Sequence, residues 1–189
     1  MKARWIPSLL ALAGIACITL AATLAPRDKP QRQSPLASFA ASWQWVQFDQ
    51  SISRGAWEQA YLHADRALAL DPASPGGWTT LASHLIFLRG SAQNEPDGLK
   101  RVAWMQAGIQ VLTEGIEKTR DPAELHLILG QTLTYYIEVL ARSEESPLPW
   151  PGGAEAAHEL GLHHFAQALA LGNLRAGDMP KVTSPPHDH

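Results

Sequence analysis

Apolar residues along most of this chain recur at spacings of three and four, the period of one face of an α-helix. Six such stretches follow one another, and no convincing alternation of apolar and polar residues indicates a strand. Segments rich in glycine, proline and polar residues separate the six stretches, at Gly55, 71–77, 89–98, 121–122 and 143–153. The sequence therefore predicts an all-α fold of six helices. They are marked by Trp45, Phe48, Ile52; Trp57, Tyr61, Leu68; Trp78, Leu81, Leu85; Val102, Met105, Ile109; Leu125, Leu129, Leu133; and Leu162, Phe165, Leu169.

Small residues seven positions apart mark the second, fourth and sixth of these predicted helices. Seven residues make nearly two helical turns, so the members of each pair lie on one face. Small side chains at such positions let two helix backbones approach closely. The pattern therefore favours antiparallel helices packed in close pairs. The pairs of small residues are Ala60 and Ala67, Gly108 and Gly115, and Gly161 and Ala168.

The segment from Gly55 to Pro72 resembles the second helix of a tetratricopeptide repeat. A turn glycine, an aromatic residue two positions later, small residues seven apart and a Leu-Asp-Pro ending follow in the family's order. Trp78-Thr-Thr-Leu-Ala resembles the first helix of the next repeat. The resemblance covers about residues 40–172 as three repeats, and it implies helix pairs in a short right-handed solenoid.

The spacing of the repeats departs from that family. Ala67, Gly115 and Ala168 lie 48 and 53 positions apart, whereas the family's period is about 34 residues. We therefore expect divergent repeats that are lengthened by loop insertions at about 89–98 and 143–153. A related helical bundle without repeats is the alternative.

In tetratricopeptide folds the first helix of each pair lines a concave groove, which is where such proteins bind peptides. Family members that grip a peptide's carboxylate present Lys, Arg and Asn there, and the corresponding positions here hold none of them. We expect this groove to prefer a neutral, apolar or basic segment of a protein partner, or to be filled by the protein's own loops. The positions that the resemblance implies are Thr79, Ser83 and Ile86, then Glu124, Leu127, Gln131, Thr134 and Tyr135.

An uncharged run of twenty residues extends from Ile6 to Ala25, enough for a helix to cross a bilayer's hydrocarbon core. We predict a signal anchor over residues 1–26 that contacts lipid through residues 6–25. A cleaved signal peptide and a lipoprotein signal ending at Cys17 are the alternatives. Ala13, Cys17 and Ala21 recur every four residues. They form a small-residue face for another helix or a second copy, or they simply reflect alanine-rich composition.

The rest of the chain divides into a polar, proline-rich linker at 27–38, the tetratricopeptide-like domain at 39–172, and a disordered tail with Pro and His at 173–189. The N-terminus resembles an export signal, so we expect a single-pass protein of a bacterial inner membrane, with its helical domain facing the periplasm or outside. We expect Leu174, Met179 and Val182, or another protein, to cover the apolar edge of the last helix. Residues 33–189 hold ten Lys and Arg against seventeen Asp and Glu, an acidic balance that argues against a nucleic-acid partner.

The chain contains no short catalytic or cofactor-binding motif of the GxSxG, P-loop, GxGxxG or EF-hand type. His158 and His163 are five residues apart, about 140° around a helix, so they do not form a zinc-binding pair, and with His164 they are expected at the surface. We therefore expect no metal, no cofactor and no enzymatic activity. The sequence predicts a membrane-tethered protein-binding adaptor or scaffold. An accessory subunit of a membrane complex is the second interpretation, and a periplasmic hydrolase the third.

Overall fold

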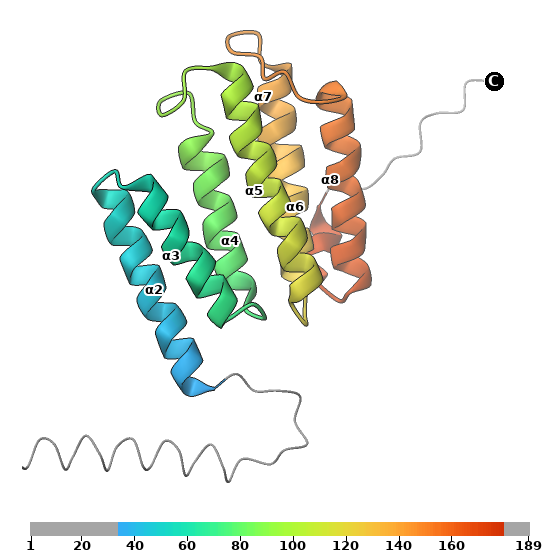
Figure 1. The fold of residues 1–189 in the computed structure, drawn as a ribbon. Coiled ribbons are helices and arrows are strands. Elements are labelled where there is room, and N and C mark those ends of the chain that lie inside the picture. The colour runs from blue at the N-terminus through green and yellow to red at the C-terminus, as the bar shows by residue number, and fades with distance from the viewer. Residues whose placement is uncertain (1–33, 180–189) are drawn as a thin grey trace, which may run out of the picture.

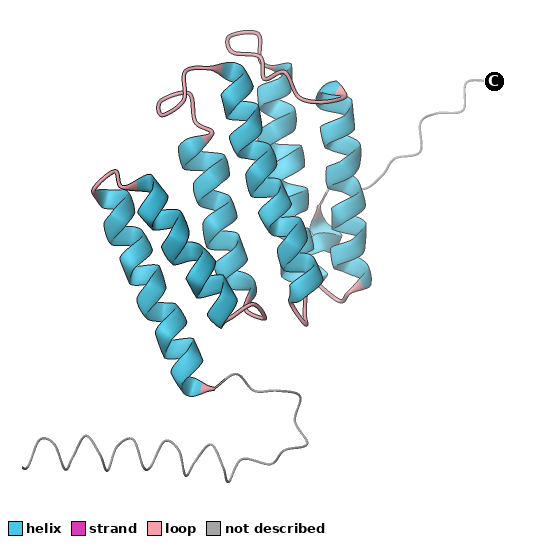
Figure 2. Cartoon of the chain, viewed as in Figure 1, coloured by secondary structure: helices cyan, strands magenta, loops and turns pink. Residues whose placement is uncertain are grey.

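A computed structural model describes residues 34–179. The predicted anchor with Ala13, Cys17 and Ala21, and residues 180–189, lie outside this range. Across 34–179 the regular structure is entirely helical, which confirms the all-α prediction (Figure 2). None of the helices between residues 34 and 179 has both the length and the apolar composition that a membrane span requires.

Six continuous helices occupy the described range, one for each predicted stretch. Two of them contain a π-helical turn in their second half, and a 3₁₀ helix follows the last. Their bounds are α2 (Pro35–Ser53), α3 (Trp57–Leu70), α4 (Pro75–Ser83) continued by η1 (His84–Arg89), α5 (Gly98–Lys118), α6 (Ala123–Gln131) continued by η2 (Thr132–Ile137) and α7 (Glu138–Arg142), α8 (Gly153–Ala170), and the 3₁₀ helix η3 (Leu174–Asp178).

Successive helices stand side by side and run in opposite directions, from α2 at one end of the array to α8 at the other (Figure 1). α2 packs on α3, α4 on α5, and α6 on α8. α4 also contacts α3 and α6, which joins the pairs. A single apolar core therefore extends from Phe48 on α2 through Trp78 to Ile137.

The small residues seven apart lie at the helix contacts, as their spacing predicts. Ala60 and Ala168 are fully buried. A Cβ added to Gly108 would lie 2.9 Å from the carbonyl oxygen of Ala82 on α4. A Cβ added to Gly161 on α8 would lie 3.1 Å from the carbonyl oxygen of Gly130 on α6. At these crossings backbone meets backbone, which leaves little room for a larger side chain.

The helical region is longer at both ends than predicted. α2 begins at Pro35, inside the predicted linker 27–38, because Ser34 Oγ accepts a hydrogen bond from the Leu36 amide (3.3 Å) and proline suits the first helical turn. At the other end, η3 lies inside the predicted disordered tail 173–189. Ala176 and Met179 pack there against apolar residues of α6 and α8. Leu174, expected to cover this edge, is instead 82% exposed, and Val182 lies outside the described residues.

Two consecutive helix pairs repeat at an offset of 48 residues. α4 and α6 begin at residues 75 and 123, and α3 and α5 end at residues 70 and 118. The two π-helical turns begin at residues 84 and 132. The offset does not extend to every boundary, because α3 and α5 begin 41 residues apart, at 57 and 98. Loops lie at 90–97 and 143–152, where insertions were expected.

Candidate binding site

The predicted groove residues divide between the core and the surface. Ile86, Leu127 and Thr134 are 1%, 2% and 4% exposed, so their side chains do not reach a partner. The resemblance placed these three at a surface, but α4 contacts α3, α5 and α6, and α6 contacts α4, α5 and α8, so neighbouring helices cover them. The remaining five predicted residues are accessible: Thr79, Ser83, Glu124 and Gln131 are partly buried and Tyr135 is 53% exposed.

Residues 173–179 lie across the predicted groove face of α6. Asn173 Nδ2 donates a hydrogen bond to Glu124 Oε2 (3.1 Å), and Arg175 forms an ion pair with the same carboxylate. Gln131 Nε2 and Tyr135 Oη approach Met179 Sδ at 3.9 and 3.7 Å. The protein's own chain therefore contacts three of the predicted groove positions, Glu124, Gln131 and Tyr135.

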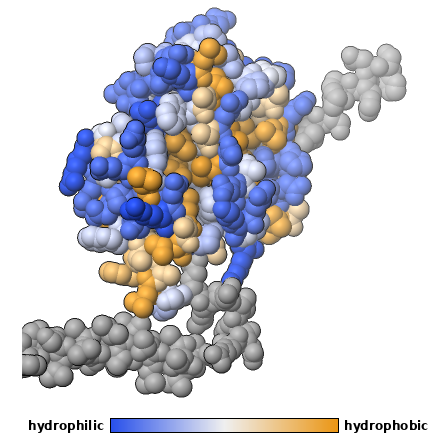
Figure 3. Space-filling view, in the orientation of Figure 1, coloured by the Kyte–Doolittle hydropathy of each residue, from blue (hydrophilic) through white to orange (hydrophobic). Residues whose placement is uncertain are grey.

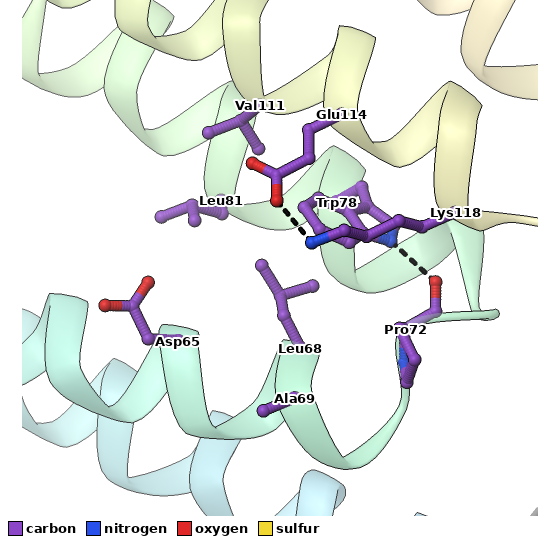
Figure 4. A pocket seen from close by; sticks show the side chains of 9 residues that line it. All are labelled: Asp65, Leu68, Ala69, Pro72, Trp78, Leu81, Val111, Glu114 and Lys118. Atoms are coloured by element: carbon purple, nitrogen blue, oxygen red, sulfur yellow. Dashed lines mark hydrogen bonds and ion pairs between the residues drawn. The ribbon is translucent and has the colours of Figure 1, made fainter.

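A cavity of about 540 Å³, which we call the Trp78 cavity, lies between α3, α4 and α5 (Figure 4). Trp78 Nε1 donates a hydrogen bond to the Pro72 carbonyl oxygen (2.9 Å). The Lys118 ammonium lies 5.2 Å from the centroid of the Trp78 ring and forms an ion pair with Glu114. The indole N–H and the cation of this cavity thus have partners within the chain, so neither calls for a ligand.

A second cavity, of about 590 Å³, has a different chemistry. The Arg89 guanidinium carbon lies 4.7 Å from the ring centroid of Trp57 and 4.7 Å from that of Trp104. The guanidinium therefore contacts two indoles, one from α3 and one from α5. We call this the Arg89 cavity; its lining is Gly55, Ala56, Trp57, Glu58, Gln59, Tyr61, Arg89 and Trp104.

His84 and Tyr61 complete the cluster around Arg89. The His84 ring centroid lies 5.6 Å from that of Trp57 and 6.3 Å from that of Tyr61. His84 and Arg89 are five residues apart, which in an α-helix places them about 140° apart. The π-helical turn between them, closed by the Gly90 amide donating to the Leu85 carbonyl (2.9 Å), brings both side chains against Trp57.

Three polar atoms of this cluster are buried without a hydrogen bond of normal geometry to a described residue: Tyr61 Oη, His84 Nε2 and Arg89 Nε. The Tyr61 oxygen lies beside the Arg89 guanidinium, but the Tyr61 hydroxyl has no acceptor for its own proton among these residues. Within residues 34–179 no carboxylate forms an ion pair with Arg89. Glu58 lines the cavity, but it is exposed at the rim. Buried polar groups are normally hydrogen-bonded, so three unsatisfied atoms in one place indicate a missing partner.

Among Tyr61, His84 and Arg89, only Arg89 carries a full positive charge at pH 7. Burial lowers the pKa of His84, and the Arg89 guanidinium lowers it further, against a smaller opposing effect of Asp49. Burial raises the pKa of Tyr61, against the opposing effect of Arg89. His84 is therefore largely neutral and Tyr61 protonated at pH 7, so Tyr61 presents a donor hydroxyl.

The second π-helical turn forms without such a polar cluster. At the positions 48 residues later, Trp57, Tyr61, His84 and Arg89 are replaced by Met105, Ile109, Thr132 and Ile137. The surroundings differ, because Trp57 and Arg89 lie at helix ends whereas Met105 and Ile137 lie inside longer helices. A π-helical turn of the same length is thus built with apolar or uncharged residues at these positions.

Sequence reasoning did not identify this site. The sequence marked Trp57 only as part of the repeat pattern, and it marked Arg89 only as the first residue of a predicted loop. The residues come from three helices, and their convergence depends on a π-helical turn that no spacing rule predicts. One signal was available: Arg89 is the single charge in the apolar stretch Leu85–Gly90.

The histidines of α8 do not form a metal site. His164, predicted to lie at the surface, is partly buried, and its Nδ1 lies 2.9 Å from Nδ1 of His126 on α6. Burial, followed by the neighbouring His126 and His163, lowers the pKa of His164 to about 4. His158 Nδ1 lies 2.7 Å from Glu138 Oε2. Among residues 34–179, no three His, Cys, Asp or Glu side chains are grouped so as to hold a metal ion.

Comparisons with protein-family models, with curated proteins and with solved structures gave no match. The tetratricopeptide resemblance therefore rests on the residues and spacings of the chain itself. Surfaces and cavities of the described residues are the basis for a functional proposal.

Proposed function

We propose that this protein is a non-catalytic adaptor that is tethered to a bacterial inner membrane through residues 6–25. Its helix pairs form a short, right-handed, tetratricopeptide-like solenoid. Its helical domain faces the periplasm or outside and binds a partner protein. One observation carries the proposal, an apolar stripe on the exposed face of α2. The stripe consists of Leu36, Phe39, Trp43 and Val46, which are 56%, 73%, 54% and 45% exposed.

The spacing of the stripe, at three, four and three residues, places its four members on one face of α2. The other face already packs on α3 through Ala41 and Phe48, which are buried. The stripe is therefore not needed to hold α2 in the fold. Figure 3 shows hydrophobic surface at the end of the molecule where α2 begins. Exposed apolar residues grouped on one helix mark an interaction surface.

The chemistry of α2 favours a protein partner over the lipid surface. Helices that lie in a membrane interface carry Lys and Arg on their polar face. α2 contains neither, and Asp49 is its one charged residue. The nine residues 26–34 between the apolar run and α2 span at most about 30 Å when extended. We therefore infer that the partner offers an apolar helix or groove close to the membrane.

Site-specific crosslinking in native membranes tests the proposal. A photoreactive amino acid replaces Phe39 or Trp43 and, as matched controls at exposed apolar positions elsewhere, Leu99 or Leu174, which are 71% and 82% exposed. We expect one protein to crosslink from positions 39 and 43 and from neither control position. The double change Leu36→Ser and Val46→Ser should abolish the product. Crosslinks to lipid alone, or the same product from all four positions, would contradict the proposal.

A second experiment separates an adaptor from a permanent subunit of a membrane complex. Ala13→Leu and Ala21→Leu enlarge the small-residue face that the sequence predicts in the anchor. An adaptor should retain the crosslink from position 39. A subunit that packs its anchor on a partner's helix should lose its place in the complex, which blue native electrophoresis measures.

A further inference from the structure

We propose that the Arg89 cavity is a binding site for a carboxylate group carried on an apolar residue or molecule. The inference goes beyond the adaptor function and does not depend on the α2 stripe. Three observations carry it: a guanidinium without an acidic partner among the described residues, buried polar atoms beside it that lack a hydrogen bond of normal geometry, and two indoles in the cavity wall.

Contact with the indoles does not use up the hydrogen-bond donors of Arg89. Trp57 and Trp104 both lie against the guanidinium, each with its ring centroid 4.7 Å from the central carbon. An indole offers an N–H donor but no acceptor, so the five N–H donors of the arginine gain no conventional hydrogen bond from these rings. A planar fork of donors matches the two oxygens of a carboxylate. The two indoles also fix the side chain in advance of binding, which lowers the entropy cost.

Further donors line the same cavity. The buried Tyr61 hydroxyl is protonated at neutral pH, and its proton has no acceptor among the described residues. The first turn of α3 forms one wall, and its N-cap residue, Ala56, provides no side-chain hydrogen bond. Amides in a first helical turn lack acceptors within the helix, and the helix dipole favours a negative charge there. A cation, a hydroxyl and a helix N-terminus thus converge on one cavity.

The charge balance selects a carboxylate over a phosphate. His84 is largely neutral at pH 7, so Arg89 is the single cation of the cluster. Glu58 at the rim, and the excess of acidic residues in 33–189, oppose a dianion more strongly than a monoanion. A volume of about 590 Å³ and two indole walls leave room for an apolar group beside the carboxylate.

The primary test measures ligand binding to the full-length chain in a mild detergent. The probes are N-acetyl-leucyl-phenylalanine, which represents a peptide C-terminus, and 3-phenylpropionate, which represents an organic acid. Each is compared with its own amide and with inorganic phosphate. Nitrogen-15 NMR follows the Arg89 Nε–H signal, which is assigned by its absence in Arg89→Lys.

We expect both carboxylates to shift this signal saturably and both amides to leave it unchanged. Tighter binding of the peptide identifies a polypeptide C-terminus as the source of the carboxylate, and equal or tighter binding of 3-phenylpropionate identifies an organic acid. Amides that bind as tightly as the acids, phosphate that binds more tightly than either acid, or no shift with any probe would overturn the proposal.

Four variants then assign the binding energy by calorimetry. Arg89→Lys keeps the positive charge but removes the planar set of N–H donors, so it should weaken binding about tenfold or more. Tyr61→Phe should weaken it about threefold to tenfold with little change in the melting temperature, because the hydroxyl proton has no acceptor in the folded chain. Glu58→Gln should strengthen binding about twofold to threefold, since a like charge leaves the rim.

Lys118→Gln is the matched control, because Lys118 is also a cation over an indole but is paired with Glu114. It should change affinity by less than about twofold. Equal weakening by Arg89→Lys and Lys118→Gln, or weaker binding to Glu58→Gln, would show that general surface charge rather than the cavity attracts the ligand.

Discussion

Gly115 on α5 faces the indole of Trp78 on α4, and a Cβ added to Gly115 would lie 2.6 Å from Trp78 Cγ. The same Cβ would lie 3.0 Å from Leu125 Cδ1 on α6. Three helices therefore meet at one glycine. Gly115→Ala should lower the free energy of unfolding by about 1–3 kcal/mol, because the core must shift to admit a methyl group.

Gly98→Ala is the matched control in the same helix, since the nearest atom to its added Cβ is 3.7 Å away. It should leave stability unchanged within about 0.5 kcal/mol or raise it slightly. Urea denaturation followed by circular dichroism measures both variants. Equal stability of Gly115→Ala and wild type would show that α4 and α5 are not in close contact at this crossing.

Trp78 also links α4 to the turn that precedes it. Its Nε1–H donates to the Pro72 carbonyl oxygen at 2.9 Å in a partly buried position. Trp78→Phe should therefore lower the free energy of unfolding by about 1 kcal/mol, because the carbonyl loses its partner. Trp43→Phe, at a side chain that is 54% exposed, should change it by less than about 0.5 kcal/mol. Similar losses in both variants would exclude a specific role for this hydrogen bond.

His164 should make the fold sensitive to mild acid. Its pKa is about 4 in the folded chain and 6.5 without the protein environment, so the unfolded chain binds more protons between these values. Stability should thus decrease as the pH falls from 6.5 toward 4. NMR titration of the His164 Hε1 signal measures the pKa directly.

His126→Asn serves as the control for that titration. It removes one neighbouring imidazole and should raise the pKa of His164, but not fully to 6.5, because burial is the largest cause of the shift. A wild-type titration midpoint near 6.5 would show that His164 is not packed against α6 as described.

The packing of the 3₁₀ helix η3 can be tested by placing aspartate at a buried position and, in a second variant, at an exposed position of the same element. Ala176 is 4% exposed and packs with Leu127 and Phe165, whereas Leu174 in the same element is 82% exposed. Ala176→Asp should lower the free energy of unfolding by about 1–3 kcal/mol, because it places a charge in an apolar contact. Leu174→Asp should have almost no effect. Thermal unfolding of the two variants compares them, and equal melting temperatures would mean that η3 does not pack on the array.

The helix contacts were predictable because close approach of two backbones restricts the residue type. Ala60, Gly108 and Gly161 lie at contacts between helices, and a spacing of seven residues identified each of them before the fold was known. Six helices with loops near 90–97 and 143–152 followed from the same periodicity.

The surfaces were less predictable, because exposure depends on what else packs nearby. Leu127 has the position of a groove residue on α6, yet it is buried beneath α8 and η3. The start of η3 depends on an Asn173 side chain that accepts a hydrogen bond from the Arg175 amide (3.2 Å), in a segment whose composition indicated disorder. Arg89 at the end of η1 meets Trp104 on α5 only because these two helices pack together, which no local pattern encodes.

The two π-helical turns share a place in their helices but not a chemistry. Each begins at the tenth residue of its helix, at His84 and at Thr132, and the two stand 48 positions apart. Such turns are rare and frequently lie at functional sites. The first turn ends on Arg89, which faces a cavity, and the second ends on the buried, apolar Ile137. One backbone feature thus directs a charged side chain to a cavity in the first helix and an apolar side chain to the core in the other.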